Sequence, residues 1–302
     1  FNVRAETVEE LLADDEIDVI VNLTIPAAHY AVSRAILEAG KHVYSEKPLV
    51  LSLEEGEELR RIAREKGLSV GCAPDTFLGG AHQLARDYID RGGIGRITPG
   101  ACYVMGPGME MWHPNPDFFF LPGGGPILDM GPYYIANLIN FIGPVKRVGA
   151  MTSMASATRT ISSQPRAGEV IEVKTPTTVQ ALLEFESGAT VTLSASWDVW
   201  SHRHANMELY GTEGSIYVPD PNFFGGLVEV SGRDKDIRAL ETWDHPFGID
   251  NQEHPHAMVA NYRTAGLADM AMALIEGRDA RCSLDRALHA VDVMTSILKS
   301  GE

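Results

Sequence analysis

The tripeptide Glu46-Lys47-Pro48 is the first place in the sequence where side chains suited to acid–base chemistry are concentrated. It follows a short apolar run, and Pro48 ends the strand that this run predicts, because proline lacks a backbone donor and fixes its own φ. Lys47 would then stand on a stiff turn at the carboxyl end of a strand, where open α/β sheets bind their ligands. A lone lysine before a proline is usually an ordinary surface residue. The strand–helix–strand unit that precedes Lys47 nevertheless favours a role in which its side chain faces a ligand.

A second group of reactive side chains follows the run Gly123-Gly124-Gly125. We expect one helix over 127–142, on which Asp129 and Tyr133 are four residues apart and therefore share a face. A carboxylate beside a phenol can orient that phenol or share a substrate hydroxyl, and the glycines would let a ligand approach the backbone closely. The alternative is a helix start with an acidic first turn and two core aromatics, and on the sequence alone it is at least as common.

Strands alternate with helices around Lys47. Continuous apolar runs predict strands at 18–24, 42–45 and 68–72, and amphipathic helices separate them. This alternation implies right-handed crossovers and a parallel sheet, which is half of a doubly wound nucleotide-binding domain. The sequence contains no strand followed by the turn G-x-G-x-x-G, so we expect the βαβ unit that carries such a turn to be missing from this chain.

The pattern changes after Gly95. A strand is expected at 98–105, followed by an irregular segment over 106–126 with a tryptophan and three phenylalanines. Such long segments in compact domains are usually functional or disordered, and the aromatic residues argue against disorder. The polar segment 156–168 reads as a mobile loop. Alternating apolar and polar residues over 179–197 predict an antiparallel hairpin with one covered face.

The expected fold class is therefore α/β followed by α+β, with a parallel doubly wound sheet in residues 1–97 and a mainly antiparallel open sheet in residues 98–302. A chain of 302 residues is long enough to divide in this way. With 25 basic and 41 acidic residues, the formal charge of −16 argues against nucleic acid or an anionic membrane as a partner. Three widely spaced cysteines favour a reducing, cytoplasmic compartment, and no apolar run reaches the ~20 residues of a membrane helix.

Four histidines leave a metal site open as an alternative. His202 and His204 would share a face of a strand, and His254 and His256 form a second pair. Together with a carboxylate they would suit a metal-dependent hydrolase or isomerase. No HExxH motif is present and the two pairs need not meet in space, so we expect no metal site.

The chain resembles the Gfo/Idh/MocA oxidoreductases, the family of glucose–fructose oxidoreductase and inositol dehydrogenase. Two motifs carry the resemblance: Glu46-Lys47-Pro48, and the Gly-Gly-Gly-x-x-x-Asp-x-Gly-x-aromatic run that ends at Tyr133. The segment Thr24-Ile25-Pro26-Ala27-Ala28-His29 is a weaker third match, and it looks like the family's loop on the nicotinamide side. The order of the motifs, and the sheet domain that follows them, fit the family over nearly the whole chain.

The resemblance implies a Rossmann domain followed by a large open-sheet domain that often mediates homo-oligomers, dimers or tetramers. It also implies oxidation or reduction of a sugar, cyclitol or related polyol with NAD or NADP. Lys47 matches the catalytic lysine and Asp129 the active-site aspartate, and Tyr133 stands where many members have histidine and some have tyrosine. The cofactor-binding residues implied are Thr24, Pro26, His29, Glu46, Lys47 and Pro48.

Substrate contacts are expected from Asp129 and Tyr133, and also from other polar or aromatic side chains: Trp112, His113 and Asp117 on the long segment, and Arg263. Arg263 could equally form a surface salt bridge. A lysine that a bound cofactor desolvates can act as a base toward the hydroxyl that loses a proton during hydride transfer. A relative without its phosphate-binding turn could instead be a non-catalytic ligand-binding or assembly module. The sequence does not distinguish NAD from NADP.

Overall fold

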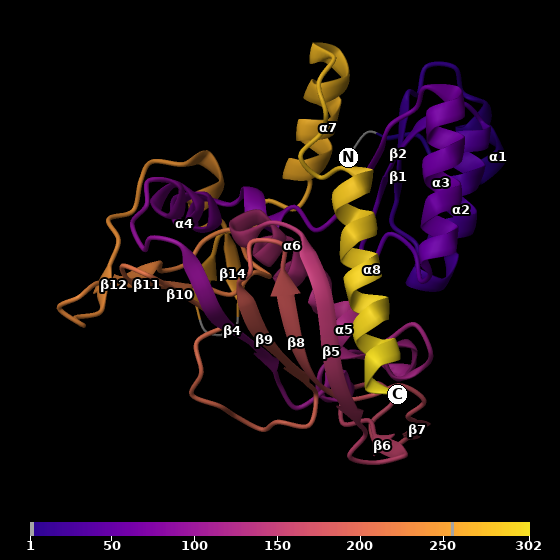
Figure 1. Cartoon of the computed structure of the whole chain (residues 1–302). Coiled ribbons are helices and arrows are strands. Elements are labelled where there is room, and N and C mark those ends of the chain that lie inside the picture. Colours follow the sequence, from indigo (N-terminus) through magenta and orange to yellow (C-terminus); the bar gives the residue numbers. More distant parts are fainter. Residues whose placement is uncertain (1–2, 255–256) are drawn as a thin grey trace. The chain divides into compact units, whose positions relative to one another are not determined.

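The computed structural model describes residues 3–254 and 257–302 (Figure 1). The chain divides into two compact units. The first consists of Phe1–Pro74 and Thr264–Asp292, and the second consists of Asp75–Arg263 and Val293–Glu302. We expected a boundary between residues 97 and 98, whereas α4 (Gly80–Asp90) belongs to the second unit and packs there on α6 (Gly131–Ile142).

A parallel three-stranded sheet forms the centre of the first unit. Its strands are β1 (Val19–Asn22), β2 (His42–Ser45) and β3 (Val70–Cys72), paired in that order. The helices described in this unit are α1 (Val8–Ala13), α2 (Pro26–Glu38), α3 (Leu53–Lys66) and α7 (Ala265–Glu276), and α8 (Leu284–Gly301) begins in it. The expected parallel α/β sheet is confirmed. A helix connects β1 to β2 and another connects β2 to β3, so each connection crosses over and the strands run parallel.

The residues at the ends of the helices in this unit have the capping roles that their types predict. Thr7 and Glu10 form a reciprocal capping box at α1. Ser52 caps α3 by accepting from the Glu55 amide, while the Glu55 carboxylate accepts from Leu51 instead of closing a second box. Gly67 ends α3 at φ 65°, a left-handed conformation that glycine adopts without strain.

An eight-stranded sheet dominates the second unit, in the order β13-β12-β11-β10-β4-β9-β8-β5. Neighbours are antiparallel except β4 and β9, which run parallel. The strands are β4 (Ile97–Met105), β5 (Val145–Ser153), β8 (Thr178–Phe185), β9 (Thr190–Ser196), β10 (Met207–Gly211), β11 (Ser215–Val218), β12 (Glu229–Ser231) and β13 (Arg238–Ala239). The expected mainly antiparallel sheet is confirmed.

One face of this sheet is covered and the other is open. Val179, Leu183 and Val191 on the covered face have no exposed surface, and α5 (Gly125–Asp129) packs on the same strands. On the opposite face Leu182 is 54% exposed and Met151 is 79% exposed. The alternation in the sequence therefore corresponds to one buried and one solvent-facing surface.

Smaller elements complete the second unit. They are the hairpins β6 (Thr158–Thr160) with β7 (Val170–Glu172) and β14 (Gln252–His254) with β15 (Ala257–Val259), and the short helices η1 (Thr76–Leu78), η2 (Met109–Met111), η3 (Asp117–Phe120) and η4 (Pro246–Gly248). No described helix is both long enough and apolar enough to cross a bilayer.

Two expectations about the second unit are wrong in detail. The helix expected over 127–142 is broken at Met130 into α5 and α6, because Pro132 has no amide to continue the hydrogen-bond ladder. The polar segment 156–168, which we expected as a mobile loop, contains strand β6 and the buried side chain of Ile161. Arg159, Ser163 and Arg166 within it contact residues that lie about 50 positions away in the sequence.

Candidate active site

The carboxyl edge of the parallel sheet is organised by Asn22, the last residue of β1. Its side-chain amide donates to the His29 carbonyl at 3.1 Å and to the Ser33 hydroxyl at 3.0 Å. Its oxygen accepts from the Thr24 amide and hydroxyl, at 3.2 and 2.7 Å. Because Asn22 and Ser33 are buried, this network fixes the turn that connects β1 to α2.

His29 joins this turn to the one that follows β2. Its ring has no exposed surface, with Nδ1 2.6 Å from the Pro48 carbonyl oxygen and Nε2 2.9 Å from the Thr24 carbonyl oxygen. Both ring nitrogens are therefore engaged by the protein. We expected His29 to contact a cofactor, but both polar atoms of its ring already contact backbone carbonyls. His29 would therefore affect cofactor binding through the positions of the two turns that it connects.

Lys47 lies on the turn immediately after β2. The strand ends at Ser45, and the Glu46 amide donates to the Asn22 carbonyl at 2.9 Å. The Lys47 amide donates to the Glu46 carboxylate at 3.1 Å, and the Lys47–Pro48 peptide bond is cis. Glu46 and Lys47 are half-buried, whereas Pro48 is buried. The turn thus places a lysine side chain at the carboxyl edge of the sheet, at the position expected from the strand-ending proline.

Tyr133 and Arg263, which we considered separately, lie together in the second unit. Tyr133 is in the first turn of α6 and is only 5% exposed. Arg263 donates to the Tyr133 hydroxyl at 2.7 Å, and its guanidinium lies 5.0 Å from the centroid of the ring. Arg263 also donates to the carbonyl and side-chain oxygens of Asn222, at 2.9 and 2.7 Å. The phenol is therefore held by a charged donor that is itself fixed.

Asp129 ends α5 and is half-buried, four residues before Tyr133 but on the other side of the break at Met130. The glycines ahead of it serve the protein's own packing. A Cβ at Gly124 would lie 2.3 Å from the Phe119 carbonyl oxygen, so protein backbone occupies the space that we had expected a ligand to use. Gly125 has φ 87°, a conformation that other residues rarely adopt.

The long segment after β4 carries the other expected substrate contacts. Trp112 is 64% exposed and meets the His113 ring edge-on, at 5.4 Å between centroids. His113 also packs against Phe118 and Phe119. Asp117 forms an ion pair with Arg166, whose guanidinium lowers the pKa of the Asp117 carboxyl group. Asp117 is thus already engaged by the protein, while Trp112 presents its indole to solvent.

A cavity of about 300 Å³ lies beside these residues in the second unit. Its lining includes Met109, Met111 and Trp112 from the long segment, together with Met130 and Tyr134. Met130 and Tyr134 directly follow Asp129 and Tyr133 in the sequence. The cavity therefore adjoins the helix junction that carries the carboxylate and the phenol.

For the metal alternative, the described residues contain no group of three His, Cys, Asp or Glu side chains that could hold an ion. The His202 and His204 rings are 6.1 Å apart, and His204 stacks on Tyr103. His254 is described, whereas His256 lies outside the described residues.

The structure adds functional candidates that we did not predict. Asn22 and Ser33 shape the edge of the sheet, and a polar residue that ends an apolar strand could have signalled Asn22. Arg159 had no such signal, because its partners Glu110 and Asp198 lie 49 and 39 residues away in the sequence. Lys47 belongs to the first unit, and Asp129 and Tyr133 belong to the second, so their convergence on one substrate stays a prediction.

Comparisons with known proteins agree with the motifs. Residues 1–73 match the family model described as an oxidoreductase family with an NAD-binding Rossmann fold, and residues 82–217 match the model of the GFO/IDH/MocA C-terminal domain. The chain is 28% identical to 1,5-anhydro-D-fructose reductase of Ensifer adhaerens over 219 residues, which cover 70% of this chain and 59% of that protein. It is 29% identical to D-xylose dehydrogenase of Paenarthrobacter nicotinovorans, over 68% of this chain and 55% of that protein.

The fold has close counterparts among solved structures. The apo form of levoglucosan dehydrogenase superposes with a TM-score of 0.81 at 23% identity, over 98% of this chain and 81% of that one. This likeness supports a Rossmann-like parallel sheet with a large mixed sheet. Alignment with the two sequence relatives spans less than two thirds of their length. Because the model of the family's Rossmann domain and the model of its C-terminal domain both match, in this order, the chain belongs to the Gfo/Idh/MocA family of oxidoreductases.

Proposed function

We propose that this protein is an NAD(P)-dependent oxidoreductase that acts on a CH–OH group of a sugar, cyclitol or related polyol. The observation that carries the proposal is Lys47, held on a fixed turn at the carboxyl edge of a parallel sheet whose sequence matches an NAD-binding family model. The two relatives named above act, by their names, on 1,5-anhydro-D-fructose and D-xylose, so sugars and anhydrosugars are the substrates to screen first.

The turns at this edge fit a nicotinamide cofactor. Leu23 and Ile25 are 72% and 58% exposed directly beyond β1, and they offer an apolar surface to a planar ring. Polar atoms of Thr24 and Glu46 lie on the neighbouring turns. When bound, the nicotinamide would accept or supply the hydride. The residues that would hold it are Thr24 and Pro26 after β1, and Glu46, Lys47 and Pro48 after β2.

The protein side chains would manage the proton and the orientation of the substrate. The neutral Lys47 amine takes the hydroxyl proton as the carbinol is oxidised, and the resulting ammonium group returns this proton in the reverse direction. Asp129 accepts a hydrogen bond from a substrate hydroxyl. Tyr133, which Arg263 orients, contacts the reacting oxygen. In this arrangement the lysine is the acid–base catalyst, and the carboxylate and phenol position the carbinol.

Replacing Lys47 tests the assignment. We expect Lys47→Met to lower kcat for the best sugar substrate by at least a hundredfold, because no other group would accept the proton. Lys66→Met is the matched control, since Lys66 is an exposed lysine of the same unit that contacts only the Glu38 carbonyl among the interactions described. Circular dichroism should show both variants folded. A loss of less than tenfold in folded Lys47→Met would refute the role.

The second candidate function is a non-catalytic binding or assembly module of the same family. Fluorescence titration with NAD(H) and NADP(H) separates the two, because the enzyme must bind one of them and a module need not. A cytoplasmic location also belongs to the proposal: the side chains of Cys72, Cys102 and Cys282 are buried thiols, as suits a reducing compartment. Cell fractionation with an antibody to the protein would test that location.

A further inference from the structure

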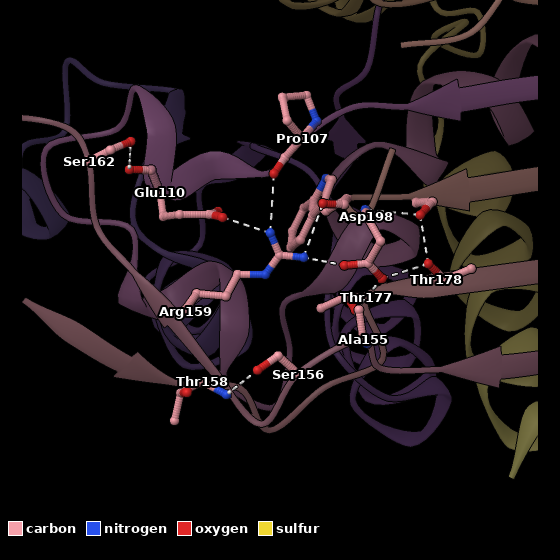
Figure 2. Close-up of polar contacts among 12 residues, drawn as sticks. Pro107, Glu110, Ala155, Ser156, Thr158, Arg159, Ser162, Thr177, Thr178 and Asp198 are labelled. Atoms are coloured by element: carbon pink, nitrogen blue, oxygen red, sulfur yellow. Dashed lines mark hydrogen bonds and ion pairs between the residues drawn. The ribbon is translucent and has the colours of Figure 1, made fainter. Parts of the chain in front are cut away.

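Arg159, at the centre of strand β6, joins parts of the second unit that are far apart in the sequence. Its guanidinium donates to the Glu110 carboxylate at 2.6 Å and to the Pro107 carbonyl at 3.1 Å. It also donates to the Trp197 carbonyl at 3.0 Å and forms an ion pair with Asp198. Figure 2 shows the contacts of the guanidinium with Pro107, Glu110 and Asp198, and the Arg159 side chain is only 13% exposed.

The sheet side of this cluster is itself held firmly. The second carboxylate oxygen of Asp198 accepts from the hydroxyl groups of Thr177 and Thr178, each at 2.7 Å (Figure 2). Thr178 is the first residue of β8, and Asp198 follows the end of β9. Arg159 is therefore anchored to the large sheet on one side and can act as a fixed point for the segment on its other side.

That other side is the segment Gly106–Trp112, which lines the 300 Å³ cavity through Met109, Met111 and Trp112. The hairpin that carries Arg159 also contacts this segment through its backbone: the Ser162 amide donates to the Glu110 carbonyl at 3.0 Å. Gly108 lies so close to the cluster that a Cβ there would meet the Glu110 carboxylate at 2.4 Å and the Arg159 guanidinium at 2.8 Å. The segment that lines the cavity thus packs against the guanidinium.

We propose that Arg159 is a positioning residue for substrate binding: it holds Gly106–Trp112 in the conformation that forms one wall of the sugar or polyol pocket. This inference rests on the proposed function for its kinetic consequence. The guanidinium suits the task because its rigid fork reaches two carboxylates and two carbonyls at once, which the point charge of a lysine cannot do. Without it, the buried carboxylate of Glu110 and the half-buried carboxylate of Asp198 would lose the cation that they share.

The kinetic test compares Arg159→Lys with wild type, using D-xylose or the sugar that a substrate screen finds best. We expect KM for the sugar to rise at least tenfold, while KM for the nicotinamide cofactor stays within twofold, because the cofactor turns belong to the first unit. A purely structural role would reduce the active fraction, and so kcat, without this split in KM. Arg147→Lys is the matched control, since Arg147 pairs with Glu184 on the sheet surface.

Hydrogen exchange gives a readout that does not depend on activity. The His113 amide donates to the Met109 carbonyl at 2.9 Å, so its exchange reports the order of the segment. We expect amides over 108–113 to exchange at least tenfold faster in Arg159→Lys, with β8 and β9 unchanged. Should Arg159→Lys fail to fold, the isosteric Glu110→Gln takes its place, with the same expectation in both experiments.

The outcomes separate the inference from the function on which it rests. No turnover by wild type with any sugar would remove the proposed function, and hydrogen exchange would then decide the role of Arg159 alone. Turnover by wild type with an unchanged sugar KM in the variant would overturn the inference and leave the function standing. Unchanged exchange over 108–113 would overturn the inference in either case.

Discussion

His82, in the first turn of α4, is a buried imidazole that the proposed chemistry does not use. It has no exposed surface, and burial lowers its pKa to about 4, although a contact of Nε2 with the Phe223 carbonyl at 2.8 Å opposes the shift. The folded protein therefore holds His82 neutral, whereas the unfolded chain can protonate it near its ordinary pKa of about 6.5. The unfolded state thus binds the extra proton between these two pH values.

This difference predicts how stability depends on pH. The stabilisation from neutral His82 is fully present above about pH 6.5 and is lost as the pH falls toward 4. Between pH 7.5 and 5 we expect wild type to lose about 2 kcal/mol more unfolding free energy than His82→Gln, which keeps a donor for the Phe223 carbonyl but cannot titrate. Urea denaturation at the two pH values measures the difference. Equal losses in both proteins would contradict the account.

Single residues differ in how far sequence reasoning can locate them. Lys47 could be placed because a strand-ending proline fixes its position along the chain. Arg159 could not, since it lies in a polar stretch and its carboxylate partners come from two other segments. Hydrophobic periodicity detects burial of apolar groups but does not report which buried ions pair. The contact between Arg263 and Tyr133 could not be predicted either, because the two residues lie far apart in the sequence and periodicity does not indicate which polar groups pair.

At the scale of elements, strands were more predictable than helix ends and connections. The run 179–185 has a strict period of two, and it forms β8 with one buried face. The break at Met130 depends on the local effect of Pro132 within an otherwise helical pattern. Strand β6 pairs with β7, and Arg159 and Ile161 have contacts from segments outside this hairpin, so no apolar periodicity marks the strand.

The open face of the large sheet leads to a prediction about assembly. Met151 on β5 and Leu182 on β8 are 79% and 54% exposed on strands that pair directly. Exposed apolar side chains on a sheet of this size are typical of a surface that binds another chain. We expect the protein to form a dimer or tetramer through this face, and Met151→Lys with Leu182→Lys to dissociate it. Sedimentation velocity measures the mass of the species.

The control for this prediction is Ile275→Lys, because Ile275 is also 79% exposed but lies on α7 in the first unit. It should leave the sedimentation coefficient unchanged. A monomeric wild type, or an unchanged mass after both substitutions on the sheet, would contradict assembly through this face.

At the scale of the whole molecule, the proposed chemistry is divided between the two units. The lysine belongs to the first and the carboxylate and phenol to the second, while helix α8 contributes residues to both. Motif order in the sequence could indicate both halves of the machinery. It could not indicate the distance between the lysine and the other two side chains, because that distance depends on how two separately packed cores are oriented.

A double-mutant cycle on Lys47 and Asp129 tests whether the two halves act on one substrate. If both side chains contact the same carbinol, their effects on kcat/KM are coupled, because the loss of one weakens what the other can contribute. We expect Lys47→Met combined with Asp129→Asn to lose at least tenfold less than the product of the single losses, a coupling of about 1.4 kcal/mol. Steady-state kinetics on the four proteins supplies the numbers.

Glu213→Gln provides the reference for independent sites, since Glu213 lies in the second unit and pairs with Arg233 at the surface. Its effect should add to that of Lys47→Met within about 0.5 kcal/mol. Equal additivity for Asp129→Asn would mean that the lysine and the carboxylate do not act on one reacting group. The assignment of both as active-site residues would then have to be abandoned, because acid–base transfer and orientation of the carbinol must occur on the same molecule of substrate.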